Sequence, residues 1–360
     1  MLKERLQRLG LDKRLKEIYK RYERFFIPGF LVVGFAFDVV TFRSLQMGAN
    51  LKLQLFYVIL AAVAFSYSLI YDALRQPPKW VVFAYLRFLA PFVEQISFGS
   101  LLSASLLFYW FSGSFSVSWP LIAVVTGVMI SSEVFRKFYM RPAVQLSVYN
   151  FVLLAYFSLL LPFVLHSLNA WVFMLSGFLS TLFVLSFVLC LGLLAPKIRQ
   201  SRQQIFVSVL MVFFVMNIFY FFKLIPPVPL AIRDAGIYHD VERVGNEYTL
   251  VGEDESFPQN LLPGQTLHIS SGDTIFAYTA IFAPSDLSTV VYHRWQYKDP
   301  ATGKWEDKGL LHFVVHGGRV EGYRGYTQKQ NLAPGKWRVT VQNRRGQVLG
   351  RLKFTLLASD

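Results

Sequence analysis

Two carboxylates lie inside long apolar stretches of the sequence, where an ionisable side chain is unusual. Asp38 stands in a stretch over residues 25–42, and Glu94 stands about one helical turn after Pro91 in a stretch over residues 89–111. Ionisable groups are costly to place in hydrocarbon and are generally paired or functional there. One interpretation is a proton or ion relay. The other, which we favour because neither residue stands at the middle of its stretch, is a structural pair near the interface.

A second set of candidate residues combines basic and aromatic side chains in the C-terminal third. Arginine forks and stacked rings are suited to binding an anionic glycan or a lipid headgroup. The alternative is a solvated face balanced by acidic residues, which the 15 Lys and Arg against 14 Asp and Glu in residues 225–360 favour. The candidates for this surface are Arg294, Arg319, Tyr323, Arg324 and Arg338.

The histidines indicate packing more than catalysis. His293 alternates with Val291 and Trp295, which predicts that it faces the packed side of a strand. A single His at such a position is more often a hydrogen-bonded core residue than a ligand or a base. Trp337 is a further core residue by the same alternation. The spacing of the histidines fits no metal motif, so we predict no metal site.

Catalytic signatures are missing from the sequence. It contains no GxSxG motif, no P-loop and no GxGxxG motif. Its one cysteine, Cys190, rules out a disulfide within the chain. We therefore predict no cofactor and favour a protein that is not an enzyme.

The elements that must position these residues are mainly apolar helices. Mean hydropathy is +0.41, and charged residues make up 16% against roughly 25% in a typical globular domain. A helix of about twenty residues crosses roughly 30 Å of hydrocarbon. The predicted spans are 25–42, 51–71, 89–111, 117–134, 146–166, 169–194 and 203–223. Within the third span, we leave open whether Pro91 starts the helix or kinks a longer one.

The basic residues predict an orientation for these spans. Residues 1–224 hold 21 Lys and Arg against 8 Asp and Glu, a balance of +13, and residues 225–360 hold a balance of +1. Basic loops alternate with loops that lack Lys and Arg, as the positive-inside rule predicts for a cytoplasmic N-terminus and a C-terminal domain beyond the membrane. The charge therefore predicts contact with the lipid bilayer and no binding of nucleic acid.

Three further segments complete the predicted organisation. Residues 1–24 carry nine Lys and Arg between apolar residues at helical spacing, which predicts an amphipathic helix on the membrane surface. Residues 224–235 contain adjacent prolines and predict an extended linker. Residues 236–360 show period-two alternation with turn signals, so we predict an all-β immunoglobulin-like sandwich after an all-α membrane bundle of about seven helices.

The C-terminal segment also carries a recognisable pattern. It reads Val291-Tyr292-His293-Arg294-Trp295, Gly318-Arg319, Tyr323-Arg324, Lys329, Gly335 to Val339, Gly346 and Leu349-Gly350. This pattern resembles a proteobacterial domain of unknown function that is usually found at the C-terminus of membrane proteins. The helical part is similar to the uncharacterised multi-spanning region that often precedes it. The resemblance implies a bacterial inner membrane and a periplasmic module, and it implies no catalytic residues.

The sequence leaves three functions open. The first, which we favour, is a bundle that anchors a periplasmic sandwich, which in turn binds a partner protein or an envelope component such as a glycan. The second is a transporter of a small molecule or lipid that uses Asp38 or Glu94. The third is a membrane enzyme that acts on a lipid-linked substrate.

Overall fold

The computed structural model describes residues 47–74, 80–111, 115–134, 141–227, 229–245, 247–253, 264–270, 272–285, 287–319 and 321–359. These residues form two compact units. The first takes its described residues from Met1–Leu107, Ala123–Leu160 and Met174–Ile218, and the second from Phe108–Ile122, Leu161–Phe173 and Phe219–Asp360. The predicted surface helix, the first predicted span and Asp38 lie outside the described residues.

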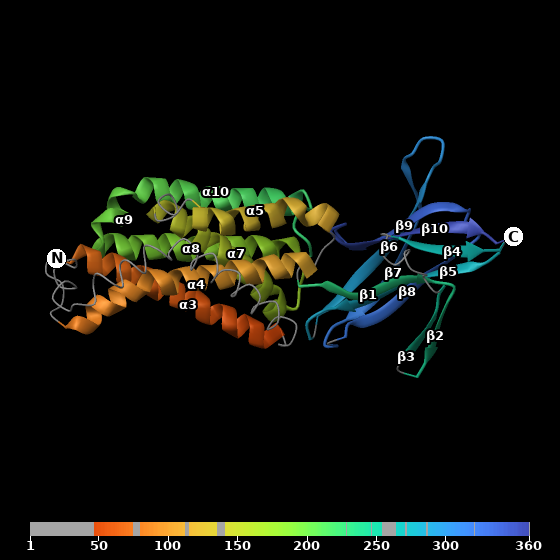
Figure 1. The fold of residues 1–360 in the computed structure, drawn as a ribbon, viewed down its shortest axis with the longest axis horizontal. Helices are drawn as coiled ribbons and strands as arrows, with labels where there is room; N and C mark the ends of the chain where they lie inside the picture. The colour runs from red at the N-terminus through yellow and green to blue at the C-terminus, as the bar shows by residue number, and fades with distance from the viewer. Residues whose placement is uncertain are drawn as a thin grey trace, which may run out of the picture. The chain divides into compact units, whose positions relative to one another are not determined.

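Seven helices are described (Figure 1). Most of them are long and apolar. Backbone polar groups in hydrocarbon must be satisfied within the segment, and a helix achieves this. Four of the described helices are long and apolar enough to cross a membrane: α3, α7, α8 and α10. The bounds are α3 Met47–Ala73, α4 Val81–Phe111, α5 Phe115–Val134, α7 Pro142–Leu165, α8 Ala170–Leu194, α9 Pro196–Gln200 and α10 Arg202–Phe221.

Helix α4 answers the question that Pro91 left open. The helix continues from Val81 to Phe111 with Pro91 inside it, so the third predicted span is the second part of one longer helix. Serines in α4 hydrogen-bond within the helix: the Oγ atoms of Ser97 and Ser105 donate to the carbonyls four residues earlier, each at 2.8 Å. Each of these bonds satisfies a serine hydroxyl within α4 itself, so the hydroxyl needs no partner on another helix.

Aromatic packing around Tyr149 holds the first unit together. Tyr149 is 3% exposed, and its ring lies 6.1 Å from the rings of both Phe98 and Phe187. Its hydroxyl donates to the carbonyl of Val58 at 3.1 Å, which ties α7 to α3. A buried phenol generally needs such a partner because an unsatisfied hydroxyl is costly in an apolar environment.

The β strands form a sandwich of a five-stranded and a three-stranded sheet, with an additional hairpin. The sheet orders are β4-β10-β9-β6-β7, β1-β5-β8 and β2-β3, and among the described strands only the β4–β10 pair is parallel. The predicted fold class is confirmed in its two parts, apolar helices followed by an all-β sandwich. The bounds are β1 Ala231–Tyr238, β2 Asp240–Val244, β3 Glu247–Val251, β4 Gln265–Ile269, β5 Thr274–Phe282, β6 Ser288–Lys298, β7 Trp305–His316, β8 Tyr323–Gln330, β9 Gly335–Asn343 and β10 Val348–Ala358.

Strand β1 begins earlier than the sequence pattern suggests. It starts at Ala231, inside the segment 224–235 that we predicted as a linker, and it pairs with β5 from Ala231 opposite Phe282 onward. Nothing in the short apolar run before Asp234 marks it as a strand by itself. Pairing with β5 is therefore what makes this run a strand.

The sandwich core lies between the inner faces of the two larger sheets. Trp295 is 0% exposed and Trp337 is 3% exposed, and both belong to one cluster with Ile275 of β5. His293 is also fully buried, and hydrogen bonds join its Nε2 to Oγ1 of Thr279 at 3.1 Å and its Nδ1 to Oγ1 of Thr327 at 2.9 Å. The structure thus places all three predicted core residues inside the sandwich.

The second unit also includes the residues around Tyr220, at the end of α10. The Tyr220 ring stacks on Phe173 with centroids 4.0 Å apart, and its hydroxyl accepts a hydrogen bond from Nη1 of Arg345 at 2.6 Å. Nε2 of Gln347 donates to the carbonyl of Ile225 at 3.1 Å. Within this unit, the turn that joins β9 to β10 is therefore held by contacts with the end of α10 and with the start of the Pro-containing segment.

The buried imidazole generates a prediction about stability. Burial lowers the pKa of His293 to about 3 from its ordinary value of 6.5. Between these two values the unfolded chain binds a proton that the folded domain does not, so stability falls as the pH falls, by up to about 1.4 kcal/mol per pH unit. His293→Gln should flatten this part of the pH dependence. Denaturant unfolding of the full chain in detergent, followed by tryptophan fluorescence, measures it, and equal slopes for both proteins would contradict the assignment.

Candidate binding surface

The outer face of the five-stranded sheet carries two of the predicted surface arginines. Arg294 on β6 forms a two-pronged ion pair with Asp307 on β7, in which Nε donates to Oδ1 at 2.7 Å and Nη2 pairs with Oδ2. Nε2 of Gln296 donates to the same Oδ1 at 2.8 Å. The charge of Arg294 is therefore neutralised within the sheet, and hydrogen bonding to Arg294 holds the pKa of Asp307 below its ordinary value.

Arg338 on β9 is held in place by a different type of contact. Its Nε donates to Oε1 of Gln296 at 2.8 Å, and its guanidinium lies 4.3 Å from the centre of the Trp305 ring. Burial, together with the positive charges of Arg351 and Arg294, lowers the pKa of Arg338. No carboxylate among the described residues forms an ion pair with it. Arg338 is thus oriented by neutral partners, repelled by Arg351 and Arg294, and attracted by Asp307.

Four cations on β9 and β10 share this outer face, one of which is Lys336. We call the other three the cationic row: Arg338, Arg351 and Lys353. Arg338 stands directly opposite Lys353 in the antiparallel register, and Arg351 stands opposite Thr340. Residues that are opposite in register point to the same side of the sheet, and like charges at such positions destabilise it. The fold therefore retains an unfavourable arrangement of charge on a solvent-accessible face.

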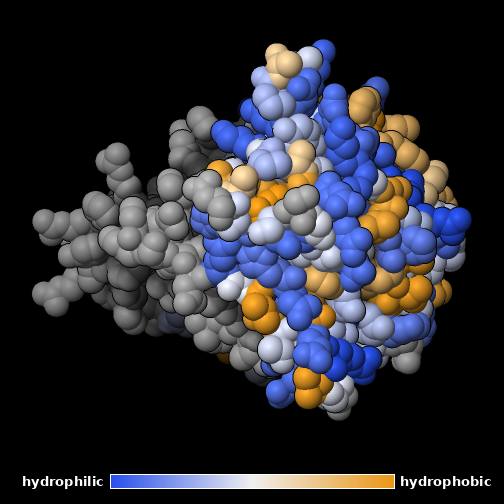
Figure 2. Space-filling view, turned by 90° about the vertical axis from the view of Figure 1, so that its right-hand side faces the viewer, coloured by the Kyte–Doolittle hydropathy of each residue, from blue (hydrophilic) through white to orange (hydrophobic). Residues whose placement is uncertain are grey.

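The other end of the same face is apolar and aromatic. Leu310 and Val314 on β7 are 54% and 45% exposed, and the ring of His312 between them lies 5.5 Å from the ring of Tyr292 on β6. Figure 2, which looks at one end of the domain, shows hydrophobic patches separated by hydrophilic residues. Exposed apolar groups of this type are common at binding sites.

The remaining predicted surface residues lie elsewhere on the domain. Arg319, just before β8, lies 5.6 Å from the ring of Tyr323, whose side chain packs against the sandwich core. Arg324 stands on β8 in the three-stranded sheet, opposite Ala280. The five residues that we predicted as one surface therefore divide into separate groups, and only Arg294 and Arg338 share a face.

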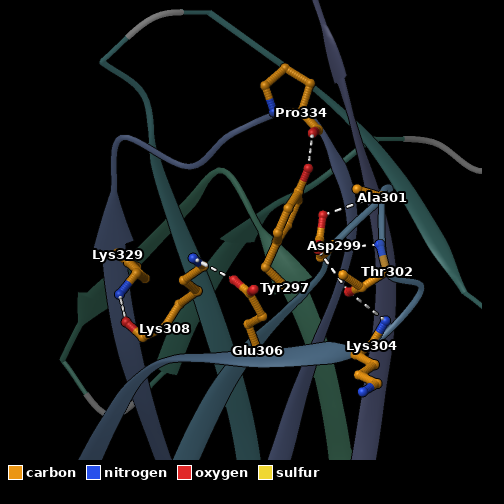
Figure 3. A network of polar contacts seen from close by, with 9 residues as sticks. All are labelled: Tyr297, Asp299, Ala301, Thr302, Lys304, Glu306, Lys308, Lys329 and Pro334. Atoms are coloured by element: carbon orange, nitrogen blue, oxygen red, sulfur yellow. Dashed lines mark hydrogen bonds and ion pairs between the residues drawn. The ribbon is translucent and has the colours of Figure 1, made fainter.

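The hairpin that joins β6 to β7 fixes the register of the candidate face (Figure 3). Asp299 accepts hydrogen bonds from the backbone N–H groups of Ala301 and Thr302 and from the Thr302 hydroxyl. The hydroxyl of Tyr297 donates to the carbonyl of Pro334 at 3.2 Å. An Asp side chain that accepts a hydrogen bond from the backbone two residues later strongly favours a turn. This turn sets the register of β6 and β7, and with it the pairing of Arg294 with Asp307.

A bulge interrupts β7 immediately after this hairpin. The register shifts between Trp295 and Gln296, and Gly309 adopts a φ of 157°, which L side chains rarely adopt. Nζ of Lys329 on β8 donates to the backbone carbonyl of Lys308, beside this glycine (Figure 3). Strand β7 is the last strand of its sheet, so this contact satisfies a carbonyl at an open edge.

Glu94 is the one intramembrane candidate that the structure describes. It is 5% exposed, and its Oε1 accepts a hydrogen bond from Nε2 of Gln145 on α7 at 2.6 Å. Arg87, which lies earlier on the same helix, pairs with Asp72 through bonds of 2.9 and 2.8 Å. The buried carboxyl is thus satisfied mainly by a neutral amide, as a structural pair requires.

A cluster that the sequence gave no reason to expect joins the β2–β3 hairpin to β4. Glu253 accepts from Nε2 of His239 and Nδ1 of His268, both at 2.9 Å, and from the backbone N–H of His268 at 2.5 Å. Partial burial would raise the pKa of Glu253, but these hydrogen bonds outweigh it and lower the pKa. Among the described residues, no group of three His, Cys, Asp or Glu is arranged to hold a metal ion.

The comparisons with known proteins concern the sandwich. A family model described as a protein of unknown function (DUF2914) matches residues 288–356, from β6 to β10, and confirms the resemblance of the C-terminal segment to such a domain. No curated protein matches the chain.

Two solved structures show weak similarity. An immunoglobulin-like protein from Pseudomonas aeruginosa is 12% identical, with 36% of this chain and 98% of that chain covered and a TM-score of 0.23. A β-glucosidase from Listeria innocua is 14% identical, with a TM-score of 0.19, and the match covers 27% of this chain and only 15% of that enzyme. TM-scores this low carry no argument about the present chain. The fold and the family match together define a protein with candidate membrane helices and a C-terminal β domain of unknown function.

The cluster at Glu253 generates a second prediction. Glu253→Gln should weaken its bonds to His239 and His268 and speed amide hydrogen exchange in residues 240–251, with Glu247→Gln on the same hairpin as the control. Because the folded pKa of Glu253 is lowered, its stabilisation is present above the ordinary carboxylate pKa, about 4.3, and is lost as the pH falls through the lower folded value. Hydrogen exchange with mass spectrometry tests both points. Unchanged protection in Glu253→Gln would show that the cluster does not hold the hairpin.

Proposed function

We propose that this chain is an integral inner-membrane protein, not an enzyme, whose helices anchor a periplasmic β domain that binds a partner protein or an envelope component. The candidate spans and the alternation of basic loops support the membrane anchor and its orientation. The match to a domain of unknown function supports a separate module at the C-terminus.

The cationic row is the observation that carries the proposal. Opposite charges at directly opposing positions stabilise a sheet. Here, however, Arg338 lies opposite Lys353, which has the same charge. Local arrangements that weaken a fold are typical of functional sites. A ligand or partner that brings negative charge to this face would offset the repulsion between Arg338 and Lys353.

Site-specific photo-crosslinking in cells tests the proposal. A crosslinking residue at Gln342 or Lys336, on the outer face of β9, should capture a defined partner. The same residue at Gln328, on β8 of the other sheet, is the matched control and should not. Deletion of residues 236–360 should abolish the cellular function. Equal capture at both faces, or full function after the deletion, would contradict a specific binding role for this domain.

A second candidate function is transport of a small molecule or lipid, and Glu94 is the observation that favours it. The carboxyl lies buried against Gln145, which also lines a small pocket with Ala61, Phe65 and Tyr149. Gln145 is therefore in contact with both the carboxyl and a space between helices.

Glu94→Gln separates transport from a structural role. The amide keeps a hydrogen-bonding group beside Gln145, so the fold should remain stable, whereas Glu94→Leu removes the partner of a buried amide and should destabilise the bundle by about 1–3 kcal/mol. Proton flux in liposomes and thermal unfolding in detergent are the two measurements. A stable Glu94→Gln protein with unchanged flux would remove Glu94 from any transport path, and a stable Glu94→Leu protein would contradict the structural pair.

A further inference from the structure

We propose that the cationic row binds an anionic polysaccharide, one whose sugar units carry carboxylate or phosphate groups. The proposal rests on the proposed function, since it names the chemistry of the component that the β domain would bind. It depends on the spacing of the cations, on the fixed orientation of Arg338 and on the polar residues between them.

The spacing of the three cations suits a ligand with repeated negative charges. Arg338 and Lys353 are opposite each other on neighbouring strands, where Cβ atoms lie roughly 5 Å apart. Arg351 stands two residues before Lys353 on β10, which places it roughly 7 Å along the strand on the same face. A single anion would contact one or two of these groups, whereas an anionic chain can contact all three.

Arg338 is already oriented for binding. Its bond to Gln296 through Nε and its stacking on Trp305 restrain the side chain. The charge of Asp307 attracts the guanidinium, but no carboxylate among the described residues forms an ion pair with it. A restrained side chain loses less conformational freedom when a ligand binds. The planar guanidinium also presents paired N–H groups that match a carboxylate or a phosphate.

The surroundings of the row favour a glycan over a protein or a lipid. Its outward neighbours include Gln342 and Thr355, which stand in the same register rows and offer an amide and a hydroxyl group. Such groups hydrogen-bond sugar hydroxyls. A protein partner generally needs an apolar centre in its binding site, and a lipid site needs apolar contact for the chains. The exposed apolar residues Leu310 and Val314 lie on β7, at the other end of the face.

Binding of the full chain to polygalacturonate provides the test. The protein is placed in nanodiscs of uncharged phosphatidylcholine, and the polymer is immobilised on a sensor at about 0.15 M salt. The triple variant Arg338→Ala, Arg351→Ala, Lys353→Ala should bind at least roughly tenfold more weakly. A matched variant, Arg243→Ala, Lys304→Ala, Arg319→Ala, loses the same charge on other surfaces and should bind like the wild type. Neutral dextran should not bind.

Each other outcome would overturn the proposal. Equal losses in the two variants would show attraction by net charge alone. Binding to phosphatidylglycerol vesicles but not to the polymer, with sensitivity to the triple variant, would assign the row to lipid headgroups. If a partner still crosslinks through Gln342 in the triple variant, and the protein does not bind the polymer, the proposed function stands and the glycan is excluded as the ligand.

Discussion

The strict alternation of side chains along β9 is the constraint on which the candidate surface depends. Trp337, Val339 and Val341 fill the core, so Arg338, Thr340 and Gln342 must point outward. A shift of one residue would bury Arg338 and expose Trp337, and the loss of burial makes this shift prohibitive. The core therefore decides which cations reach the outer face, even though none of them contributes to the core.

The same constraint explains how much could be predicted from the sequence. Apolar runs of about twenty residues located six of the helices, because length and hydropathy are local properties. The alternation within β9 and β6 likewise pointed to Trp337, Trp295 and His293 as inward residues. In both cases the prediction needed only neighbouring residues in one element.

Pairings between distant strands could not be predicted. Arg338 meets Lys353, and Arg294 meets Asp307, only after the register of four strands is set by turns and a bulge. The cluster at Glu253 combines residues 14 and 15 positions apart in separate elements. The near-neutral net charge of the domain likewise gave no sign of the cationic row, because a sum over the sequence does not show which charges share a face.

The contact between Lys329 and the carbonyl of Lys308 has a consequence for the solubility of the domain. An open edge strand offers unpaired backbone groups to any other strand, and β7 carries the apolar sequence Leu310 to Val315 beside that edge. The bulge at Gly309 and the charged ammonium on the Lys308 carbonyl interrupt the row of groups that a second strand would need. Protection against edge-to-edge aggregation is thus provided by Lys329 of β8 and by the bulge beside the hairpin that sets the register of the candidate face.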